Sequence, residues 1–146
     1  MLIIWAAILM TQGIFVAIVF VTRPGLLNFE FSMPLLGPGG RATGSTSAVI
    51  IAFAVAAVTA VLFSFAFKRR LNERAVEAQD PTQVQTGLII ALALCEAASL
   101  FGLALAFAFD YQYFFLLIAL GAGAIVLHFP RREPLHAAVY RSQPPS

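Results

Sequence analysis

The sequence predicts an all-α polytopic membrane protein with four transmembrane helices arranged as two hairpins. Hydrophobic residues make up 60% of the 146 residues and charged residues only 11%, whereas a typical soluble domain is about a quarter charged. The apolar residues gather in long uninterrupted runs, and the charges lie between or after those runs. About 20 apolar residues in a helix cross the roughly 30 Å of bilayer hydrocarbon. We therefore expect one four-helix membrane domain over residues 1–146.

The expected elements follow in order along the chain. Four apolar runs are predicted spans, at residues 2–21, 47–67, 84–109 and 113–129. Three polar segments separate or follow them: an outer loop at 22–46, a cytoplasmic loop at 68–83 and a flexible tail at 130–146. The outer loop is rich in Gly and Pro, which interrupt a helix. The first run lacks a basic start and a small-residue cleavage site, so we interpret it as a retained span rather than a signal peptide.

The basic residues predict the orientation of the chain. Four Lys or Arg lie in the loop at 68–83 and three in the tail, whereas the loop at 22–46 carries two. Because basic residues concentrate on the cytoplasmic side, the middle loop and both termini are expected there. The predicted location is the bacterial inner membrane.

Composition and spacing argue against several classes of function. The net charge of +2 comes from basic residues at the ends of apolar runs, without the basic stripe that nucleic-acid binding needs. His128 and His136 have no further ligand residues near them in the sequence, so no metal site is expected. Cys95 is the one cysteine, and we interpret it as a buried thiol. With no nucleophile and base at one depth, neither an enzyme nor a cofactor is expected.

Glu96 is the residue that calls for an explanation. It lies near the middle of the third run, with no other charge between Gly87 and Phe109. A charged group at that depth costs a few kcal/mol, while the neutral acid costs less and can donate one hydrogen bond. Gln12 and Thr11 lie at a similar depth in the first span, and Thr59 and Ser99 are further candidate partners. Two roles stay open: a reversible proton site, or a neutral group that fixes helix packing.

Small residues predict where the helices pack closely. In the second span they recur every four residues, at Ala48, Ala52, Ala56, Ala60 and Ser64. The third span adds Gly102, and the fourth adds Gly123 with the neighbouring Gly121. A helix face of small side chains lets another backbone approach. We expect these positions to pack within the chain or between chains.

Residues 77–109 resemble the polar loop and carboxylate-bearing helix of the rotor-ring c subunit, or proteolipid, of rotary ATP synthases. That family joins a small-residue helix to a second helix through a polar loop that contains proline, and the second helix carries one mid-depth carboxylate. The matching residues here are Gln79-Asp80-Pro81 in the loop, then Ala93-Leu94-Cys95-Glu96-Ala97 and Gly102-Leu103. The loop has Gln79 where the family has a basic residue. The resemblance implies that Glu96 binds a proton reversibly, and Ala97, which has no hydroxyl, favours protons over sodium.

Three functional hypotheses follow. The first is a small non-catalytic integral membrane subunit of a larger complex, packed through small-residue helix faces around the mid-membrane carboxylate. The second is a proteolipid-like subunit that translocates protons through Glu96. The third is a small proton-coupled transporter. The expected partners are the lipid bilayer, other membrane subunits or copies of the same chain, and protons in the second and third hypotheses.

Overall fold

The computed structural model describes residues 2–27 and 44–130, and every element in these two segments is helical. Four α-helices and a short 3-10 helix follow each other: α1 Leu2–Thr22, η1 Pro24–Leu27, α2 Gly44–Ala78, α3 Pro81–Phe109 and α4 Phe114–Leu127. The predicted all-α class is confirmed for the described chain. Most of the outer loop, including Arg41, and the tail from Arg131 onward lie outside the described residues.

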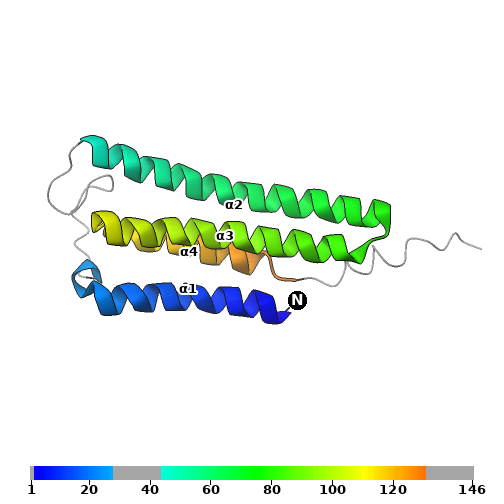
Figure 1. Cartoon of the computed structure of the whole chain (residues 1–146), viewed down its shortest axis with the longest axis horizontal. Coiled ribbons are helices and arrows are strands. Elements are labelled where there is room, and N and C mark those ends of the chain that lie inside the picture. The colour runs from blue at the N-terminus through cyan, green and yellow to red at the C-terminus, as the bar shows by residue number, and fades with distance from the viewer. Residues whose placement is uncertain (1, 28–43, 131–146) are drawn as a thin grey trace, which may run out of the picture.

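Successive helices run in opposite directions, so the chain passes up and down through a bundle (Figure 1). The helix α3 packs along α2 on one side and α4 on another, while α1 contacts α3 and α4. In Figure 1, α3 and α4 lie between α2 and α1. The α3 helix is therefore the centre of the molecule, and three other helices pack against it.

The α2–α3 hairpin is longer than the sequence analysis predicted. The helix α2 continues to Ala78 through most of the predicted loop at 68–83, and only Gln79 and Asp80 form the turn. Arg, Leu, Glu and Ala favour helix, and Arg69 pairs with Glu73 one turn later at 2.9 Å. As a result, the hairpin projects past the ends of α1 and α4 (Figure 1).

Local chemistry explains the sharp start of α3. Gln79 takes a left-handed conformation with φ 53°, which ends α2. Asp80 then caps α3, because its Oδ1 accepts the Thr82 N–H at 2.9 Å. Pro81 occupies the first turn, where its missing N–H is not needed.

Three helices, α1, α2 and α3, are long and apolar enough to cross a membrane. This is consistent with an integral membrane protein. The fourth predicted span corresponds to α4, which has 14 residues and is therefore about 21 Å long at 1.5 Å per residue. Asp110 has a left-handed backbone and begins a turn, so α4 starts only at Phe114. Pro130 follows soon after the end of α4 and disfavours a longer helix. By length, three helices therefore qualify as full spans, and α4 is shorter than a full span.

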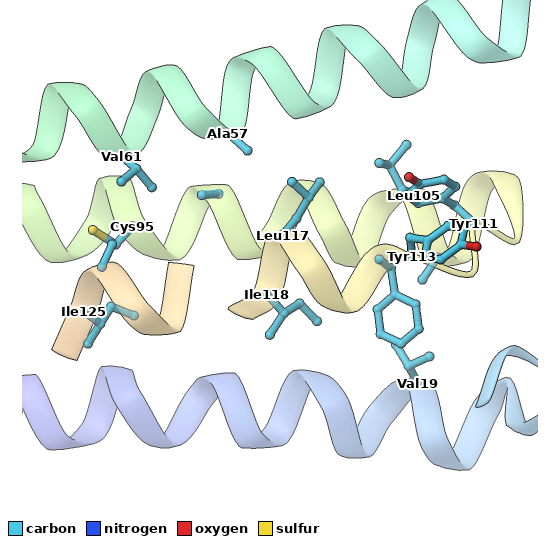
Figure 2. Packing of buried hydrophobic residues seen from close by; sticks show 14 of the residues in the cluster. Val19, Ala57, Val61, Cys95, Leu105, Tyr111, Tyr113, Leu117, Ile118 and Ile125 are labelled. Atoms are coloured by element: carbon cyan, nitrogen blue, oxygen red, sulfur yellow. The ribbon is translucent and has the colours of Figure 1, made fainter. Parts of the chain in front are cut away.

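The buried apolar core forms along α3, where all four helices meet. Figure 2 shows side chains from every helix and from the α3–α4 turn directed into the centre: Val19, Ala57, Val61, Cys95, Leu105, Tyr111, Tyr113, Leu117, Ile118 and Ile125. The outer faces of α1 and α2 keep large apolar side chains exposed, such as Ile3 at 84% and Leu62 at 65%. A bilayer or other membrane chains would cover such faces.

Candidate functional site

Glu96 lies on α3 where α1 crosses it, and its side chain is half-buried. The Thr11 hydroxyl of α1 lies 2.9 Å from Glu96 Oε1, within hydrogen-bond distance. Thr11 was one of the partners expected from depth alone. The carboxyl group therefore connects α3 to α1 inside a single chain.

The Thr11 hydroxyl can serve either protonation state of Glu96. Its oxygen also lies 2.6 Å from Ile8 O in its own helix, and a hydroxyl carries one proton and two lone pairs. When that proton goes to Ile8 O, a neutral Glu96 acid can donate to Thr11 Oγ1. When Glu96 is ionised, the hydroxyl can turn and donate to the carboxylate. The contact between α1 and α3 is compatible with both forms.

Gln12, the other expected partner on α1, does not bond to Glu96. Its side chain is buried, with 4% of its surface exposed. Neither its amide nitrogen nor its amide oxygen has a hydrogen-bond partner among the described residues. A step of one residue turns a helix by about 100°, so Gln12 points to a different side of α1 from Thr11.

The two remaining candidate partners lie elsewhere. Thr59 is exposed on α2. Ser99 is fully buried on α3, and its Oγ has no hydrogen-bond partner in the described part of the chain. Ser99 instead lies against Gly121, where an added Cβ would overlap Ser99 Oγ. Ser99 is thus a packing residue between α3 and α4.

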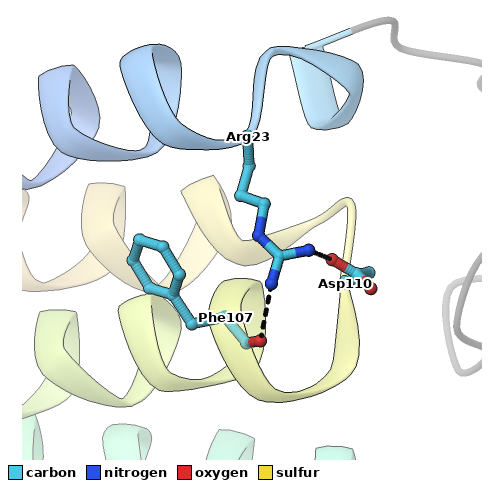
Figure 3. A network of polar contacts seen from close by, with 3 residues as sticks. All are labelled: Arg23, Phe107 and Asp110. Atoms are coloured by element: carbon cyan, nitrogen blue, oxygen red, sulfur yellow. Dashed lines mark hydrogen bonds and ion pairs between the residues drawn. The ribbon is translucent and has the colours of Figure 1, made fainter.

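Two further polar contacts attach α1 to the rest of the bundle. Trp5 Nε1 donates to Ile125 O at 2.7 Å near the start of α1. At its other end, Arg23 Nη1 forms a 2.6 Å ion pair with Asp110, and Nη2 approaches Phe107 O at 3.5 Å (Figure 3). Only Gln12 and Val19 are buried on α1. Trp5, Ile8, Leu9 and Phe15 of α1 also pack, partly buried, against the core. Polar contacts at the start, middle and end of α1 therefore add to this apolar packing.

A second polar cluster, which sequence reasoning missed, joins α2, α3 and the end of α4. Ser64 Oγ lies 2.9 Å from His128 Nε2 and 3.4 Å from Cys95 Sγ, and it donates to Val61 O at 2.6 Å. Lys68 Nζ donates to His128 O at 3.3 Å. His128 is 1% exposed. Ser64 and His128 lie at similar depths, near the ends of the second and fourth predicted spans. This similarity of depth is the sequence signal that pairs them.

The small-residue positions divide into packed and outward-facing ones. Ser64 is buried, Ala56 and Ala60 are half-buried, and Ala48 and Ala52 are exposed. The face that α2 buries runs instead through Ile50, Ala57, Val61 and Ser64. Of the four alanines on this face, only Ala56 and Ala60 therefore take part in packing within the chain.

Glycines allow the close approach of α3 and α4. At Gly102 an added Cβ would lie 2.7 Å from Phe114 O, and at Gly121 it would lie 2.6 Å from Cys95 O. Gly102 is thus a packing residue, as expected. Gly123 is exposed and has nothing within 4 Å of an added Cβ, so Gly121 takes the role expected for it.

Among the described residues, no group of three or more His, Cys, Asp or Glu side chains could hold a metal ion. The candidate site therefore consists of the Glu96 carboxyl group of α3 and the Thr11 hydroxyl of α1. No protein-family model, curated protein or solved structure matches the chain.

Proposed function

We propose that the chain is a non-catalytic integral membrane subunit of a larger membrane complex, in which Glu96 attaches α1 to α3. The observation that carries the proposal is the contact between Glu96 Oε1 and the Thr11 hydroxyl at 2.9 Å. It supports a structural role for the carboxyl group inside its own chain.

The energetics of helix association in lipid support this role. Hydrocarbon chains are as apolar as leucine, so burial of apolar surface adds little drive to association between spans. Interhelical hydrogen bonds contribute on average about 0.6 kcal/mol and up to about 1.7 kcal/mol each. The helix α1 buries two side chains and packs Trp5, Ile8, Leu9 and Phe15 partly buried against the core. Its three polar contacts with α3, α4 and the turn add to this attachment.

The same proposal includes α4 as the fourth span. Its 14 residues are shorter than the hydrocarbon layer, and a short span is accommodated by local thinning and by interfacial anchors. Phe129, just after α4, is 48% exposed and supplies an aromatic side chain for one of those interfaces. With four spans, both termini and the α2–α3 turn lie on the cytoplasmic side.

Partner chains in the complex would cover the exposed apolar faces of α1 and α2. Ile3 is 84% exposed on α1 and Val55 is 60% exposed on α2. The partners are other membrane subunits or copies of this chain, with the lipid bilayer around the remainder.

A second candidate function is reversible proton binding at Glu96. Two observations favour it: the carboxyl group is only half-buried, and the Thr11 hydroxyl can bond to the acid or to the carboxylate. A proteolipid-like proton-translocating subunit would use such a group.

The substitution Glu96→Gln separates the two functions, because glutamine keeps a hydrogen-bond donor and acceptor but cannot titrate. We expect Glu96→Gln to assemble normally in reconstituted vesicles and leave proton flux unchanged. Normal assembly with loss of proton flux, and with loss of labelling by dicyclohexylcarbodiimide, would establish the proton-carrying function instead. Protection of Glu96 from this label by a transported substrate would establish a proton-coupled transporter.

A further inference from the structure

One face of α2 combines aromatic rings with a guanidinium group at the end of the bundle. Phe63, Ala66, Phe67 and Arg70 line a shallow hollow of about 110 Å³. Successive members of this set are three, one and three residues apart, so all four lie on one face of α2. The rings of Phe63 and Phe67 lie 6.3 Å apart and form its apolar wall.

The hollow lies where the apolar bundle gives way to the charged projection of the α2–α3 hairpin. Lys68 Nζ donates to His128 O, which places this level of α2 beside the end of α4. Phe63 and Phe67 are 53% and 45% exposed. The aromatic wall is thus open to the surroundings of the bundle, and Arg70 lies one turn further toward the projection.

Arg70 forms no ion pair among the described residues. Neighbouring Arg69 pairs with Glu73 at 2.9 Å, and Lys68 donates to the end of α4. Within residues 2–27 and 44–130, the ion pairs are Arg23–Asp110 and Arg69–Glu73, and neither includes Arg70. Arg74 lies one further turn along the same face and adds a second positive charge.

We infer that this hollow binds an anionic phospholipid, with its phosphate on Arg70 and the first part of an acyl chain against Phe63 and Phe67. The order of groups along α2, apolar and then cationic, matches the order along such a lipid. A guanidinium group presents two parallel N–H donors to phosphate. Free phosphate would make no use of the aromatic wall, and a soluble peptide would not reach a helix face within the hydrocarbon.

The neighbouring residues provide matched controls for a binding experiment. Arg69 precedes Arg70 by one residue, is about 100° around the helix and is paired with Glu73. Leu62 is exposed at a similar depth but outside the hollow. Arg70→Gln and Phe67→Ala test the site, while Arg69→Gln and Leu62→Ala test for non-specific changes at the same level.

The full chain, purified in a neutral detergent, is incubated with equal amounts of phosphatidylglycerol and phosphatidylcholine, and retained lipid is measured by native mass spectrometry. We expect the wild-type chain to retain phosphatidylglycerol in preference, and Arg70→Gln to reduce the preference about fivefold, as for loss of one basic side chain near anionic lipid. Phe67→Ala should lower retention of both lipids, and both control variants should behave as wild type. Excess inorganic phosphate should displace little lipid.

Three results would overturn the site. One is an unchanged lipid preference in Arg70→Gln, and another is an equal loss in Arg69→Gln and Arg70→Gln, which would indicate general attraction to a basic helix. The third is complete displacement of the lipid by inorganic phosphate. Arg70→Lys keeps the charge without the fork of donors and should retain an intermediate preference. Circular dichroism of each variant checks that the helices remain folded.

Discussion

At the scale of single residues, the proposed role of the Glu96 carboxyl group rests on its contact with Thr11. Removing the hydroxyl with Thr11→Val, or the carboxyl with Glu96→Leu, deletes the hydrogen bond at 2.9 Å. A double-mutant cycle on the free energy of unfolding in detergent should give a coupling of about 0.6–1.7 kcal/mol.

Thr22→Val is the matched control for that cycle, because Thr22 donates only to Ile18 O in its own helix. It should show no coupling to Glu96→Leu. Glu96→Gln should preserve most of the coupling to Thr11, since an amide still bonds to the hydroxyl. Equal coupling for Thr11 and Thr22 would mean that the cycle reports general loosening of α1 rather than this bond.

Substitution of Gln12, the residue after Thr11, is expected to change the free energy of unfolding in the opposite direction. Gln12 is buried, and its amide atoms have no partner among the described residues. An unsatisfied buried amide costs about 1–3 kcal/mol. Gln12→Leu should therefore raise the free energy of unfolding, measured by detergent titration, while Thr11→Val lowers it. A loss of stability in Gln12→Leu would show that another chain or a bound water satisfies the amide.

The sequence predicted the depth of the site residues along their helices, but not which side of α1 faces Glu96. Counting residues from the ends of the apolar runs placed Thr11, Gln12 and Glu96 at similar levels. Which of Thr11 and Gln12 faces Glu96 depends on the rotation of α1 about its axis, which depth does not fix. The almost uniformly apolar α1 sequence offers no polar stripe from which that rotation could be deduced.

At the scale of elements, the α3–α4 contact depends on glycine. Gly121→Ala should destabilise the fold by about 1–3 kcal/mol, as overpacking typically does, because the new methyl group would meet Ser99 and the backbone of Cys95. Gly123→Ala is the control, since the space there is open. It should be neutral or stabilise α4 by about 1 kcal/mol. Thermal unfolding of both variants gives the comparison, and similar losses in the two would contradict the packing described here.

The start of α3 should be sensitive to pH through Asp80. Hydrogen bonds from the Thr82 hydroxyl and the Thr82 backbone N–H lower the pKa of Asp80 below its ordinary value of 3.8. Because the pKa is lower in the folded state than in the unfolded state, the ionised cap stabilises fully above pH 3.8 and is lost as pH falls through the folded value.

Hydrogen exchange of the first amides of α3 measures this effect. Protection in wild type should be constant from neutral pH to about 5 and fall at more acid pH. Asp80→Asn keeps a side-chain cap without a titrating group, so its protection should lack the acid-dependent fall. An equal fall in wild type and Asp80→Asn would assign the change to other carboxyl groups.

At the scale of the whole molecule, the proposed orientation can be tested by labelling. In a Cys95→Ala background, Gly25→Cys and Glu77→Cys put a thiol near opposite ends of the bundle, and both native residues are exposed. An impermeant maleimide should label Gly25→Cys in intact cells and Glu77→Cys only after the membrane is permeabilised. The reverse pattern would contradict cytoplasmic termini.

The sequence predicted the helical class and the long apolar helices because hydrophobic run length is a direct consequence of bilayer thickness. It misplaced the ends of helices. The charged segment after Phe67 was interpreted as a loop, although its residues favour helix and continue α2 to Ala78. The fourth run was expected to span 113–129, and α4 covers Phe114–Leu127, which lies within two residues of that expectation at each end. Hydropathy marks where a chain is apolar, whereas caps, left-handed turns and prolines decide where a helix stops.

The central claim is that this chain is a subunit whose carboxyl group holds its own helices together. The mass of the particle purified in a mild detergent, compared between wild type and Glu96→Gln, tests that claim most directly. We predict that wild type purifies as an assembly containing further polypeptides or several copies of the chain, and that Glu96→Gln gives the same mass. A wild-type particle with the mass of one chain, or an assembly that dissociates in Glu96→Gln, would contradict it.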